Sequence, residues 1–190
     1  MTSTERPYRS LLTAHSQHFM KHIFLFPTEP EAAAFRALCP DAEVIISGVG
    51  MAESAATLAR RQSQLEGCVV VLAGIAGAYT EHCHVGEVVE VLEERIVELP
   101  ERFGKSYKVE PLTNLRGVIS NTVCSCGAEC CNADIENMEG AVLFAMSEAM
   151  SIRLVEIRAI SNIVGEEFSK WDIPLATENL AEALKRFFID

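Results

Sequence analysis

Short runs of apolar residues recur along the chain and predict the strands of a sheet. Residues 22–27 (HIFLFP) form the first run, and a proline ends it, as expected where a buried strand stops. The run Cys68–Leu72 (CVVVL) is apolar at every position, which is typical of a strand covered on both faces. Four further segments are predicted as strands: Glu43–Ser47, Val85–Leu92, Arg116–Val123 and Leu154–Ile160.

Between these runs, apolar residues recur at helical spacing. A first helix is predicted over Glu29–Leu38, with acidic residues in its first turn, and a second over Met51–Arg61. Small residues of the second helix recur at i, i+3, i+4 and i+7 and predict a packing face: Ala52, Ala55, Ala56 and Ala59. A third helical stripe consists of Met138, Val142, Ala145, Met146 and Ala149. A last helix starts at Asp172-Ile173-Pro174 and presents Leu180, Ala183, Leu184, Phe187 and Phe188.

Strands and helices largely alternate, with β-rich material in the middle of the chain. This order predicts an α/β domain of three layers, α/β/α, with a central mixed β-sheet. In such folds small molecules bind beyond the carboxyl ends of the strands. Five segments at predicted strand ends are therefore expected to meet at one cleft: Pro27–Glu31, Ser47–Gly50, Ala73–Gly77, Asn121–Val123 and Ser161–Asn162.

The polar N-terminal segment Met1–Phe19 is predicted as a disordered extension, and the folded domain is predicted over residues 20–190. The extension lacks the continuous apolar stretch that a secretory signal requires. The chain has 190 residues, which is enough for one domain with a hydrophobic core. Met20 is expected near the start of that domain, and it could also be the true start of translation.

The net charge of −11 argues against nucleic acid or an anionic membrane surface as a partner, because both require a basic face. An acidic surface is most simply a device for solubility. No apolar run approaches the roughly 18 residues that span a bilayer. These properties predict a cytoplasmic protein without nucleic-acid or membrane partners.

The seven cysteines fall into two groups. Cys39, Cys68 and Cys83 lie in or near apolar segments and are predicted as small core residues. The other four are clustered within eight residues: Cys124, Cys126, Cys130 and Cys131. Zinc sites usually use two spaced pairs, so this cluster favours reduced cytosolic thiols over a metal site or a disulfide. We expect no metal and no cofactor.

Two motifs place polar side chains where apolar elements begin and end. In IENMEGA (135–141) the carboxylate of Glu139 precedes an apolar helix, and in RAISN (158–162) the amide of Asn162 follows an apolar strand. A carboxylate can bind ribose hydroxyls, and an amide can hold a purine through its donor and its acceptor. A site that cleaves nucleosides needs both groups, a carboxylate for the ribose and an amide for the purine.

The order of eight segments resembles the type I nucleoside phosphorylase and nucleosidase superfamily, in particular the futalosine hydrolases. These are purine nucleosidases of an alternative menaquinone pathway. The resemblance covers the chain from about residue 20 to its end. The segments are PTEPEA (27–32), SGVGMAESAATLA (47–59), AGIAGAY (73–79), VGEVVEV (85–91), NTV (121–123), IENMEGA (135–141), RAISN (158–162) and WDIPLATENL (171–180).

The resemblance implies hydrolysis of a purine N-glycosidic bond and a role for each matching residue. Glu31 would be the general base that activates water, although Glu29 lies close in sequence. Glu139 would bind the ribose 2′- and 3′-hydroxyls, Met138 would pack against the sugar, and Asn162 would bind the base near N7 and O6. Further substrate-binding residues are expected at Asn137, Ile75, Gly77, Asn121, Thr122, Val123 and Trp171.

Each of these residues also has a structural interpretation. Glu31 and Glu139 suit the positive ends of helices, and Asn162 could cap a turn. Trp171 could either pack in the fold or form a lid over the substrate. Glu136 is interpreted as structural, and Arg158 is expected to pair with a carboxylate inside the fold.

The resemblance also bears on the choice of base and nucleophile. The related methylthioadenosine/S-adenosylhomocysteine nucleosidases have an aspartate at the position of Asn162, which suits adenine. An amide can serve both N7 and O6, so Asn162 favours a 6-oxopurine such as hypoxanthine, and futalosine as the nucleoside. Many phosphorylases carry an arginine where this chain has Leu72 and Ala73, so water is favoured over phosphate as the nucleophile.

One segment departs from the family pattern. Between NTV and IENMEGA the family usually has a longer stretch with a helix, whereas Cys124–Asp134 is short and rich in cysteine. The rival interpretations are a methylthioadenosine-type nucleosidase, a nucleoside phosphorylase, a non-catalytic purine-nucleoside-binding protein, and a metal or redox sensor. The family pattern also implies a homodimer or larger homo-oligomer.

Overall fold

The computed structural model describes residues 20–79, 83–97, 99–127 and 132–190. The extension predicted for Met1–Phe19 lies outside these residues. The strands are β1 (His22–Phe26), β2 (Val44–Ile46), β3 (Val69–Ala78), β4 (Val88–Ile96), β5 (Ser106–Lys108), β6 (Arg116–Thr122), β7 (Ile135–Asn137) and β8 (Arg153–Ile163). The helices are α1 (Glu29–Leu38), α2 (Gly50–Leu65), α3 (Gly140–Met150) and α4 (Ile173–Phe188), with short 3₁₀ helices at Glu101–Phe103 and Phe168–Lys170.

The strands form one mixed sheet in the order β2-β1-β3-β7-β6-β4-β5, and β8 pairs with both β3 and β4. These pairings close a ring of β3, β7, β6, β4 and β8, and β1, β2 and β5 extend it at the sides. The strands β1, β2, β3 and β8 run parallel, whereas β7 is antiparallel to β3 and β4 is antiparallel to β8. The central mixed sheet predicted from the sequence is confirmed.

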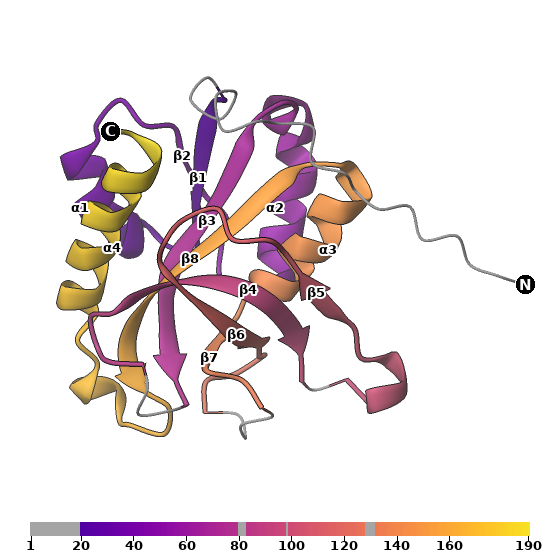
Figure 1. The fold of residues 1–190 in the computed structure, drawn as a ribbon, viewed down its shortest axis with the longest axis vertical. Helices are drawn as coiled ribbons and strands as arrows, with labels where there is room; N and C mark the ends of the chain where they lie inside the picture. Colours follow the sequence, from indigo (N-terminus) through magenta and orange to yellow (C-terminus); the bar gives the residue numbers. More distant parts are fainter. Residues whose placement is uncertain (1–19, 80–82, 98, 128–131) are drawn as a thin grey trace, which may run out of the picture.

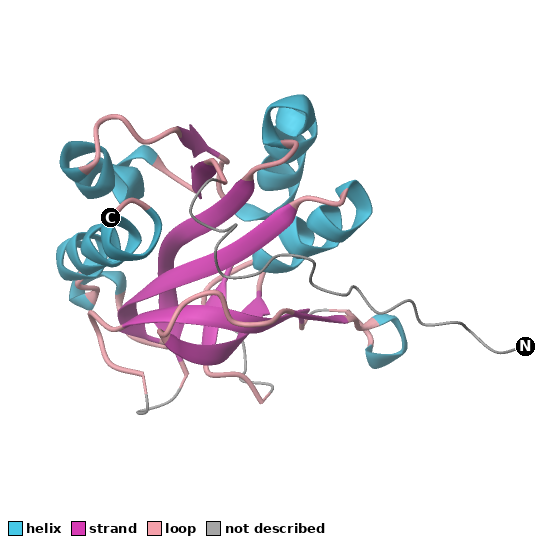
Figure 2. Ribbon diagram, turned by 45° about the horizontal axis from the view of Figure 1, so that its top comes forward, coloured by secondary structure: helices cyan, strands magenta, loops and turns pink. Residues whose placement is uncertain are grey.

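Helices cover the sheet on two sides (Figures 1 and 2). On one side α1 and α4 pack together over a core that includes Phe24, Phe35 and Leu184. On the other side α2 and α3 pack together over a second core that includes Leu58, Leu72 and Phe144. The α/β/α architecture is therefore the predicted one. Among the described residues, no helix has the length and hydropathy needed to cross a membrane.

The first and last helices begin where the sequence indicates. Helix α1 has the predicted bounds, and Thr28 caps it, because its Oγ1 accepts a hydrogen bond from the backbone N–H of Glu31 at 3.3 Å. Helix α4 begins after Asp172, whose Oδ1 accepts a hydrogen bond from the backbone N–H of Leu175 at 3.1 Å. These caps satisfy backbone donors that a helix start leaves free.

The predicted packing face of α2 is wrong, whereas the stripe predicted for α3 is right in part, because its Val142 and Met146 pack against the second core. In α2, Ala52, Ala56 and Ala59 are exposed. The buried residues of α2 are Ser54, Thr57, Leu58 and Leu65. The leucines offer far more apolar area than alanine methyl groups, so they decide which side of the helix faces the sheet. In α3, likewise, Ala149 is exposed. The residues that α3 buries are Gly140, Ala141, Leu143, Phe144 and Ser147.

Two strands are longer than predicted and two were not predicted at all. Strand β3 continues through Gly77 to Ala78, and β8 continues through Asn162 to Ile163. Residues 73–77 and 161–162 therefore lie inside strands, near their carboxyl ends, and not in the loops that follow. The unpredicted strands β5 and β7 each have three residues and too little apolar character to stand out.

Candidate active site

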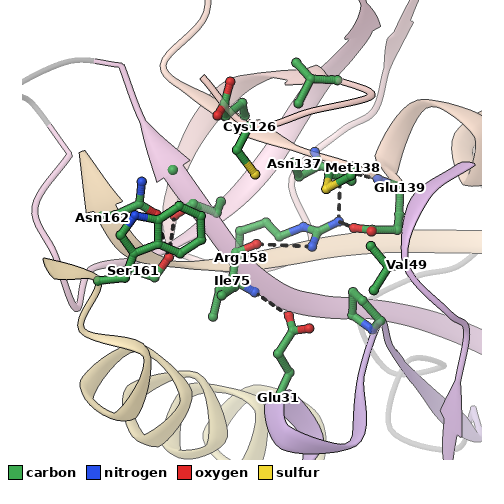
Figure 3. A pocket seen from close by; sticks show the side chains of 16 residues that line it. Glu31, Val49, Ile75, Cys126, Asn137, Met138, Glu139, Arg158, Ser161 and Asn162 are labelled. Atoms are coloured by element: carbon green, nitrogen blue, oxygen red, sulfur yellow. Dashed lines mark hydrogen bonds and ion pairs between the residues drawn. The ribbon is translucent and has the colours of Figure 1, made fainter. Parts of the chain in front are cut away.

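One cavity of about 150 Å³ opens beside the ends of the strands. Each of the five segments predicted to meet at a cleft contributes at least one residue to its wall. Glu31, Arg158 and Glu139 lie toward one end of the cavity, and Ser161 and Asn162 lie toward the other (Figure 3). The lining residues are Pro27, Glu31, Val49, Ile75, Ala76, Gly77, Val123, Cys126, Glu136, Asn137, Met138, Glu139, Arg158, Ser161, Asn162 and Trp171.

Glu31 reaches the cavity from the first turn of α1 and is 8% exposed. One carboxylate oxygen accepts a hydrogen bond from the hydroxyl of Thr28 at 2.7 Å. The other accepts from the backbone N–H of Ile75 at 2.9 Å, so strand β3 fixes the side chain that α1 supplies (Figure 3). Burial raises the pKa of the Glu31 carboxyl above its usual value, against the lowering effect of these hydrogen bonds. The group is therefore poised to accept a proton more readily than an exposed glutamate.

Arg158 is the buried cation at the centre of this end of the cavity. Its Nε donates to Glu156 Oε1 at 2.7 Å, and its Nη2 donates to Glu139 Oε2 at 3.2 Å. The same Nη2 donates to Asn137 Oδ1 at 3.1 Å, and Nη1 donates to the carbonyl of Ile75 at 3.4 Å. Burial opposes the charge, but the carboxylates of Glu156 and Glu139 outweigh it and raise the pKa of the guanidinium. The predicted pairing of Arg158 with a carboxylate inside the fold is confirmed.

Glu139 lies at the start of α3 and is 3% exposed. Its Oε1 accepts a hydrogen bond from the backbone N–H of Gly50 at 2.9 Å, while Oε2 faces Arg158. Gly50 is the first residue of α2, so the positive end of that helix also favours the carboxylate. The backbone N–H of Glu139 donates to Asn137 Oδ1 at 2.8 Å. Groups from three elements thus hold Glu139 in one orientation.

Gly74 permits the close approach of Glu31 and Arg158. A Cβ atom at this position would lie 2.7 Å from Arg158 Nη1 and 2.8 Å from Glu31 Oε2. Any side chain on this residue of β3 would therefore displace one of the two groups. The AGIAGA sequence of β3 leaves its cavity-facing surface bare, and charged groups from neighbouring elements occupy the space.

Two further carboxyl groups lie beneath the cavity, and neither lines it. Glu94 and Glu156 are both fully buried, and burial raises the pKa of each, most strongly that of Glu94. Burial and the nearby charge of Glu156 favour the protonated form of Glu94. Glu156 then carries the negative charge that faces Arg158.

At the other end of the cavity, the amide of Asn162 is held at the end of β8. Its Nδ2 donates to the carbonyl of Ile163 at 3.1 Å, and its Oδ1 accepts from the hydroxyl of Ser161 at 2.8 Å. Trp171 lines the cavity next to them, with its indole N–H donating to the carbonyl of Glu166 at 3.3 Å. Its ring contacts that of Phe168, with 5.0 Å between the centroids. Trp171 thus contributes both to packing and to the cavity wall.

Most residues predicted to bind substrate do line the cavity, and two do not. The lining members are Asn137, Met138, Ile75, Gly77, Val123 and Trp171. The hydroxyl of Thr122 instead donates to Glu94 at 2.8 Å and accepts from the backbone N–H of Ala141 at 2.7 Å. Asn121 is fully buried behind the wall, and its amide has no hydrogen-bond partner among the described residues. Thr122 thus supports the site through Glu94 and the start of α3, and neither residue reaches the cavity.

Sequence reasoning singled out neither Glu136 nor Cys126 as part of the cavity wall. Glu136 was interpreted as structural, and Cys126 as one thiol in a cluster; both line the cavity. The position of Glu136 two residues before Met138 was an available signal, because alternate residues of an extended segment share a face. The departure of the Cys124–Asp134 segment from the family pattern therefore falls on the cavity wall itself.

The cysteines divide largely as expected. Cys39, Cys68 and Cys83 are buried, so their prediction as core residues is confirmed. Cys124 and Cys126 are exposed, whereas Cys130 and Cys131 lie outside the described residues. Within the described part of the chain, no group of three or more cysteine, histidine or acidic side chains has the geometry to hold a metal ion.

Comparisons with known proteins identify the fold. No model of a protein family matches the chain, and no curated protein matches it. The S-adenosylhomocysteine nucleosidase of Streptococcus pyogenes, solved in complex with 5-methylthiotubericidin, superposes with a TM-score of 0.76 at 20% identity, over 88% of this chain and 95% of that one. A futalosine hydrolase mutant of Helicobacter pylori gives 0.77 at 13% identity, over 88% and 98% of the two chains.

A nucleosidase of Chlamydia trachomatis bound to methylthioadenosine gives a TM-score of 0.76 at 17% identity, over 90% of this chain and 100% of that one. The structure therefore has the fold of the nucleoside phosphorylases and nucleosidases across nearly its whole described length. The fold implied by the sequence motifs is confirmed.

The Arg158 ion pairs predict a stability loss that depends on pH. We expect Arg158→Met to lower the free energy of unfolding by about 3–5 kcal/mol at neutral pH, because it leaves buried carboxylates without a counter-charge. Arg158 lowers the pKa of Glu156, so its removal raises this pKa further; at mildly acidic pH the carboxyl of the variant then takes up a proton and the loss should shrink. Urea unfolding at neutral pH and at mildly acidic pH measures this loss in the free energy of unfolding.

Arg153→Met is the matched control for this measurement. Arg153 lies on the same strand and is only half-buried, so its replacement should change the stability by about 0.5 kcal/mol or less at either pH. A loss in Arg158→Met that is small, or that does not vary with pH, would contradict the ion-pair account.

Proposed function

We propose that this protein is a purine nucleosidase that hydrolyses the N-glycosidic bond of a 6-oxopurine nucleoside, most specifically futalosine. The observation that carries the proposal is the arrangement of two buried carboxylates and one amide around a single cavity. Glu31 and Glu139 come from different helices and meet on either side of Arg158, and Asn162 lies toward the opposite end. The fold shared with known nucleosidases supports the same reaction class.

Glu139 is the group suited to the ribose. Breaking the bond between C1′ and N9 builds positive charge on the sugar, as in other glycoside hydrolyses. An ionised carboxylate that accepts hydrogen bonds from the 2′- and 3′-hydroxyls favours that charge, and each such bond contributes about 1.5–3 kcal/mol. Arg158 and the backbone N–H of Gly50 fix the carboxylate for this task. Met138 lies beside it in the cavity wall and offers an apolar surface to the sugar.

Glu31 is the group suited to water. Its raised pKa makes it a better proton acceptor than an ordinary glutamate, and two hydrogen bonds hold it in place. In the reaction the water oxygen bonds to C1′ and its proton passes to Glu31, while the electron pair of the broken bond leaves with the purine. A positioned general base of this kind contributes about 10²–10⁴ in rate.

Asn162 is the group suited to the leaving purine. An amide presents a donor, which can bind O6 of a 6-oxopurine, and an acceptor, which can bind N7 once the departing base takes up a proton there. A donor aimed at the departing base stabilises its growing negative charge, a contribution of about 3 kcal/mol in comparable sites. Ser161 and the carbonyl of Ile163 hold the amide in one orientation. The short Cys124–Asp134 segment contributes Cys126 to the same cavity, so the size of the accepted nucleoside depends on it.

The state of Arg158 favours water over phosphate as the nucleophile. Among the described residues that line the cavity, Arg158 is the only lysine or arginine. Its hydrogen bonds already go to Glu156, Glu139, Asn137 and the carbonyl of Ile75, so its charge is compensated inside the protein. A phosphate dianion would meet this end of the cavity with two carboxylates and no free cation.

The second candidate is a methylthioadenosine or S-adenosylhomocysteine nucleosidase. The fold supports this candidate, because two of the three solved structures compared above are a nucleosidase bound to methylthioadenosine and an S-adenosylhomocysteine nucleosidase. The amide at Asn162 favours the 6-oxopurine. A role in menaquinone synthesis, a cytoplasmic location and assembly as a homodimer or larger homo-oligomer belong to the proposal and stay predictions.

A substrate panel tests the proposal. Futalosine, inosine, methylthioadenosine and S-adenosylhomocysteine are incubated with the protein, each with and without phosphate, and the free base is measured by chromatography. We expect hypoxanthine from futalosine at a rate that phosphate does not change. Adenine release would assign the second candidate, phosphate dependence would make the protein a phosphorylase, and no release from any nucleoside would contradict the proposal.

The pH dependence separates the roles of the two carboxylates. Glu31 acts as a base only when ionised, so kcat/KM should fall as pH drops through its raised pKa, above the range of an ordinary glutamate. Glu31→Gln should lose about 10²–10⁴ in kcat/KM and lose this acid limb, because no base remains to titrate. Glu139→Gln should lose at least about 100-fold while the acid limb stays.

Glu148→Gln serves as the control for these profiles. Glu148 is exposed on α3 and pairs with Lys105, far from the cavity wall, so its variant should keep the wild-type rate and profile. An acid limb that survives in Glu31→Gln would remove Glu31 from the role of base.

A further inference from the structure

Two carboxyl groups meet under the start of helix α3, away from the cavity wall. They belong to Glu94 on β4 and Glu156 on β8, and both side chains are fully buried. A Cβ atom built on Gly140, the first residue of α3, would lie 2.5 Å from Glu94 Oε2 and 2.7 Å from Glu156 Oε2. One oxygen of each carboxyl group therefore lies against the same glycine.

The side chains around Glu94 approach it as hydrogen-bond donors. Its Oε1 accepts from the hydroxyl of Thr122 at 2.8 Å, and its Oε2 accepts from Asn137 Nδ2 at 3.0 Å. The Thr122 oxygen already accepts from the backbone N–H of Ala141, so its proton is free to point to Glu94. The Oδ1 of Asn137 accepts from Arg158, so its Nδ2 is the atom that faces Glu94. Neither neighbour requires Glu94 to donate a proton to it.

Glu156 has one oxygen with a hydrogen-bond donor and one without. Its Oε1 accepts from Arg158 Nε at 2.7 Å, whereas no described residue donates to the buried Oε2 while both carboxyl groups are ionised. A buried oxygen without a donor costs free energy. Glu94 Oε2 lies beside it and becomes a donor when it carries a proton. Burial and the charge of Glu156 raise the pKa of Glu94 well above its usual range, which favours that proton.

Glu94 also supports the start of α3, where Glu139 stands. The hydroxyl of Thr122, which donates to Glu94, accepts the backbone N–H of Ala141 at 2.7 Å. The amide of Asn137, which also donates to Glu94, accepts the backbone N–H of Glu139 at 2.8 Å and that of the next residue at 2.7 Å. These N–H groups are among those that a helix start leaves free. Glu94 therefore orients the two side chains that cap α3.

We propose that Glu94 and Glu156 share one proton and that Glu94 is thereby a positioning residue for Glu139. The proton lies between Oε2 of Glu94 and Oε2 of Glu156, so the pair carries one negative charge, and this charge faces Arg158. Two ionised groups would repel each other at the start of α3 and leave both oxygens without a donor. The role of Glu139 rests on the proposed function, whereas the shared proton does not depend on turnover.

Infrared spectroscopy detects the shared proton directly. A carboxyl group that keeps its proton at neutral pH has a C=O stretching band that is separate from the bands of carboxylates. We expect this band in the wild-type protein and its loss in Glu94→Gln and in Glu156→Gln, because the new amide donates in place of the proton. A wild-type protein without the band, or a band that Glu94→Gln leaves unchanged, would overturn the proposal.

Glu90→Gln is the matched control for the spectra. Glu90 is buried on the same strand as Glu94, but its two oxygens accept hydrogen bonds from Leu112 and Thr113 and do not face another carboxyl group in these contacts. This variant should keep the band of the wild-type protein.

Glu94→Met tests the positioning role. Methionine fills the space but offers Thr122 and Asn137 no acceptor, whereas Glu94→Gln keeps a neutral group with an acceptor. With futalosine, or with whichever nucleoside of the panel is cleaved, kcat should fall at least about 100-fold in Glu94→Met and no more than about tenfold in Glu94→Gln. The loss falls on kcat because Glu139 stabilises charge that develops only in the transition state.

Hydrogen exchange gives the same comparison without turnover. The backbone N–H of Ala141 should exchange faster in Glu94→Met than in the wild-type protein, and Glu94→Gln should keep its protection. Equal kcat values, or equal exchange rates, in the two Glu94 variants would refute the positioning role. If neither Glu94 variant folds, the wild-type infrared band and its loss in Glu156→Gln decide.

Failure of this inference is distinguishable from failure of the proposed function. A protein that has the carboxyl band and the expected exchange rates but cleaves no nucleoside would contradict the proposed function and leave the shared proton standing. A protein that cleaves futalosine but lacks the band would contradict this inference alone.

Discussion

The buried guanidinium of Arg158 is the group around which the site is arranged. It joins β8, which carries it, to the start of α3 through Glu139, to β7 through Asn137 and to β3 through the carbonyl of Ile75. A buried cation is costly unless carboxylates and carbonyls surround it, so these elements must come together around it. Glu156 also offsets the charge of Arg158, so Glu139 is not its only counter-charge.

The two carboxylates of the proposed reaction differ because their surroundings differ. The carboxylate of Glu139 contacts the charged guanidinium of Arg158 and the backbone N–H of Gly50. Glu31 is bound by the neutral donors Thr28 and Ile75, and burial dominates and raises its pKa. In the proposed reaction Glu139, which is paired with Arg158, stabilises charge on the sugar, while Glu31 can take up a proton. Separation of roles by environment is a general feature of paired carboxylates in active sites.

Much of the fold could be predicted from the sequence, because buried strands and helix caps leave local signals. The run of apolar residues in β3 and the caps at Thr28 and Asp172 are such signals. The prediction of the packing face of α2 was wrong, because helical spacing shows that a stripe of alanines exists but not how much apolar area that stripe would bury. Strand β7 was missed because three residues, two of them polar, carry no local sign of a strand that exists only through its pairing.

The site could be predicted in part for the same reason. Strand ends indicated which segments meet, and each of them does contribute to the cavity. The placement of Thr122 behind the wall depends on the twist and register of β6, and that of Glu136 opposite Asn162 depends on the pairing of β7 with β3. Contacts of this kind join residues that are far apart in sequence, so no local pattern contains them.

The central claim is that Glu31 directs water to the sugar carbon. The most direct measurement is to let the protein act on futalosine in water enriched in ¹⁸O, with phosphate present, and to analyse the sugar product by mass spectrometry. The account predicts a sugar with one ¹⁸O at C1 and no sugar phosphate, at the earliest time before exchange with solvent. A sugar 1-phosphate, or a sugar whose C1 oxygen carries no label, would contradict it.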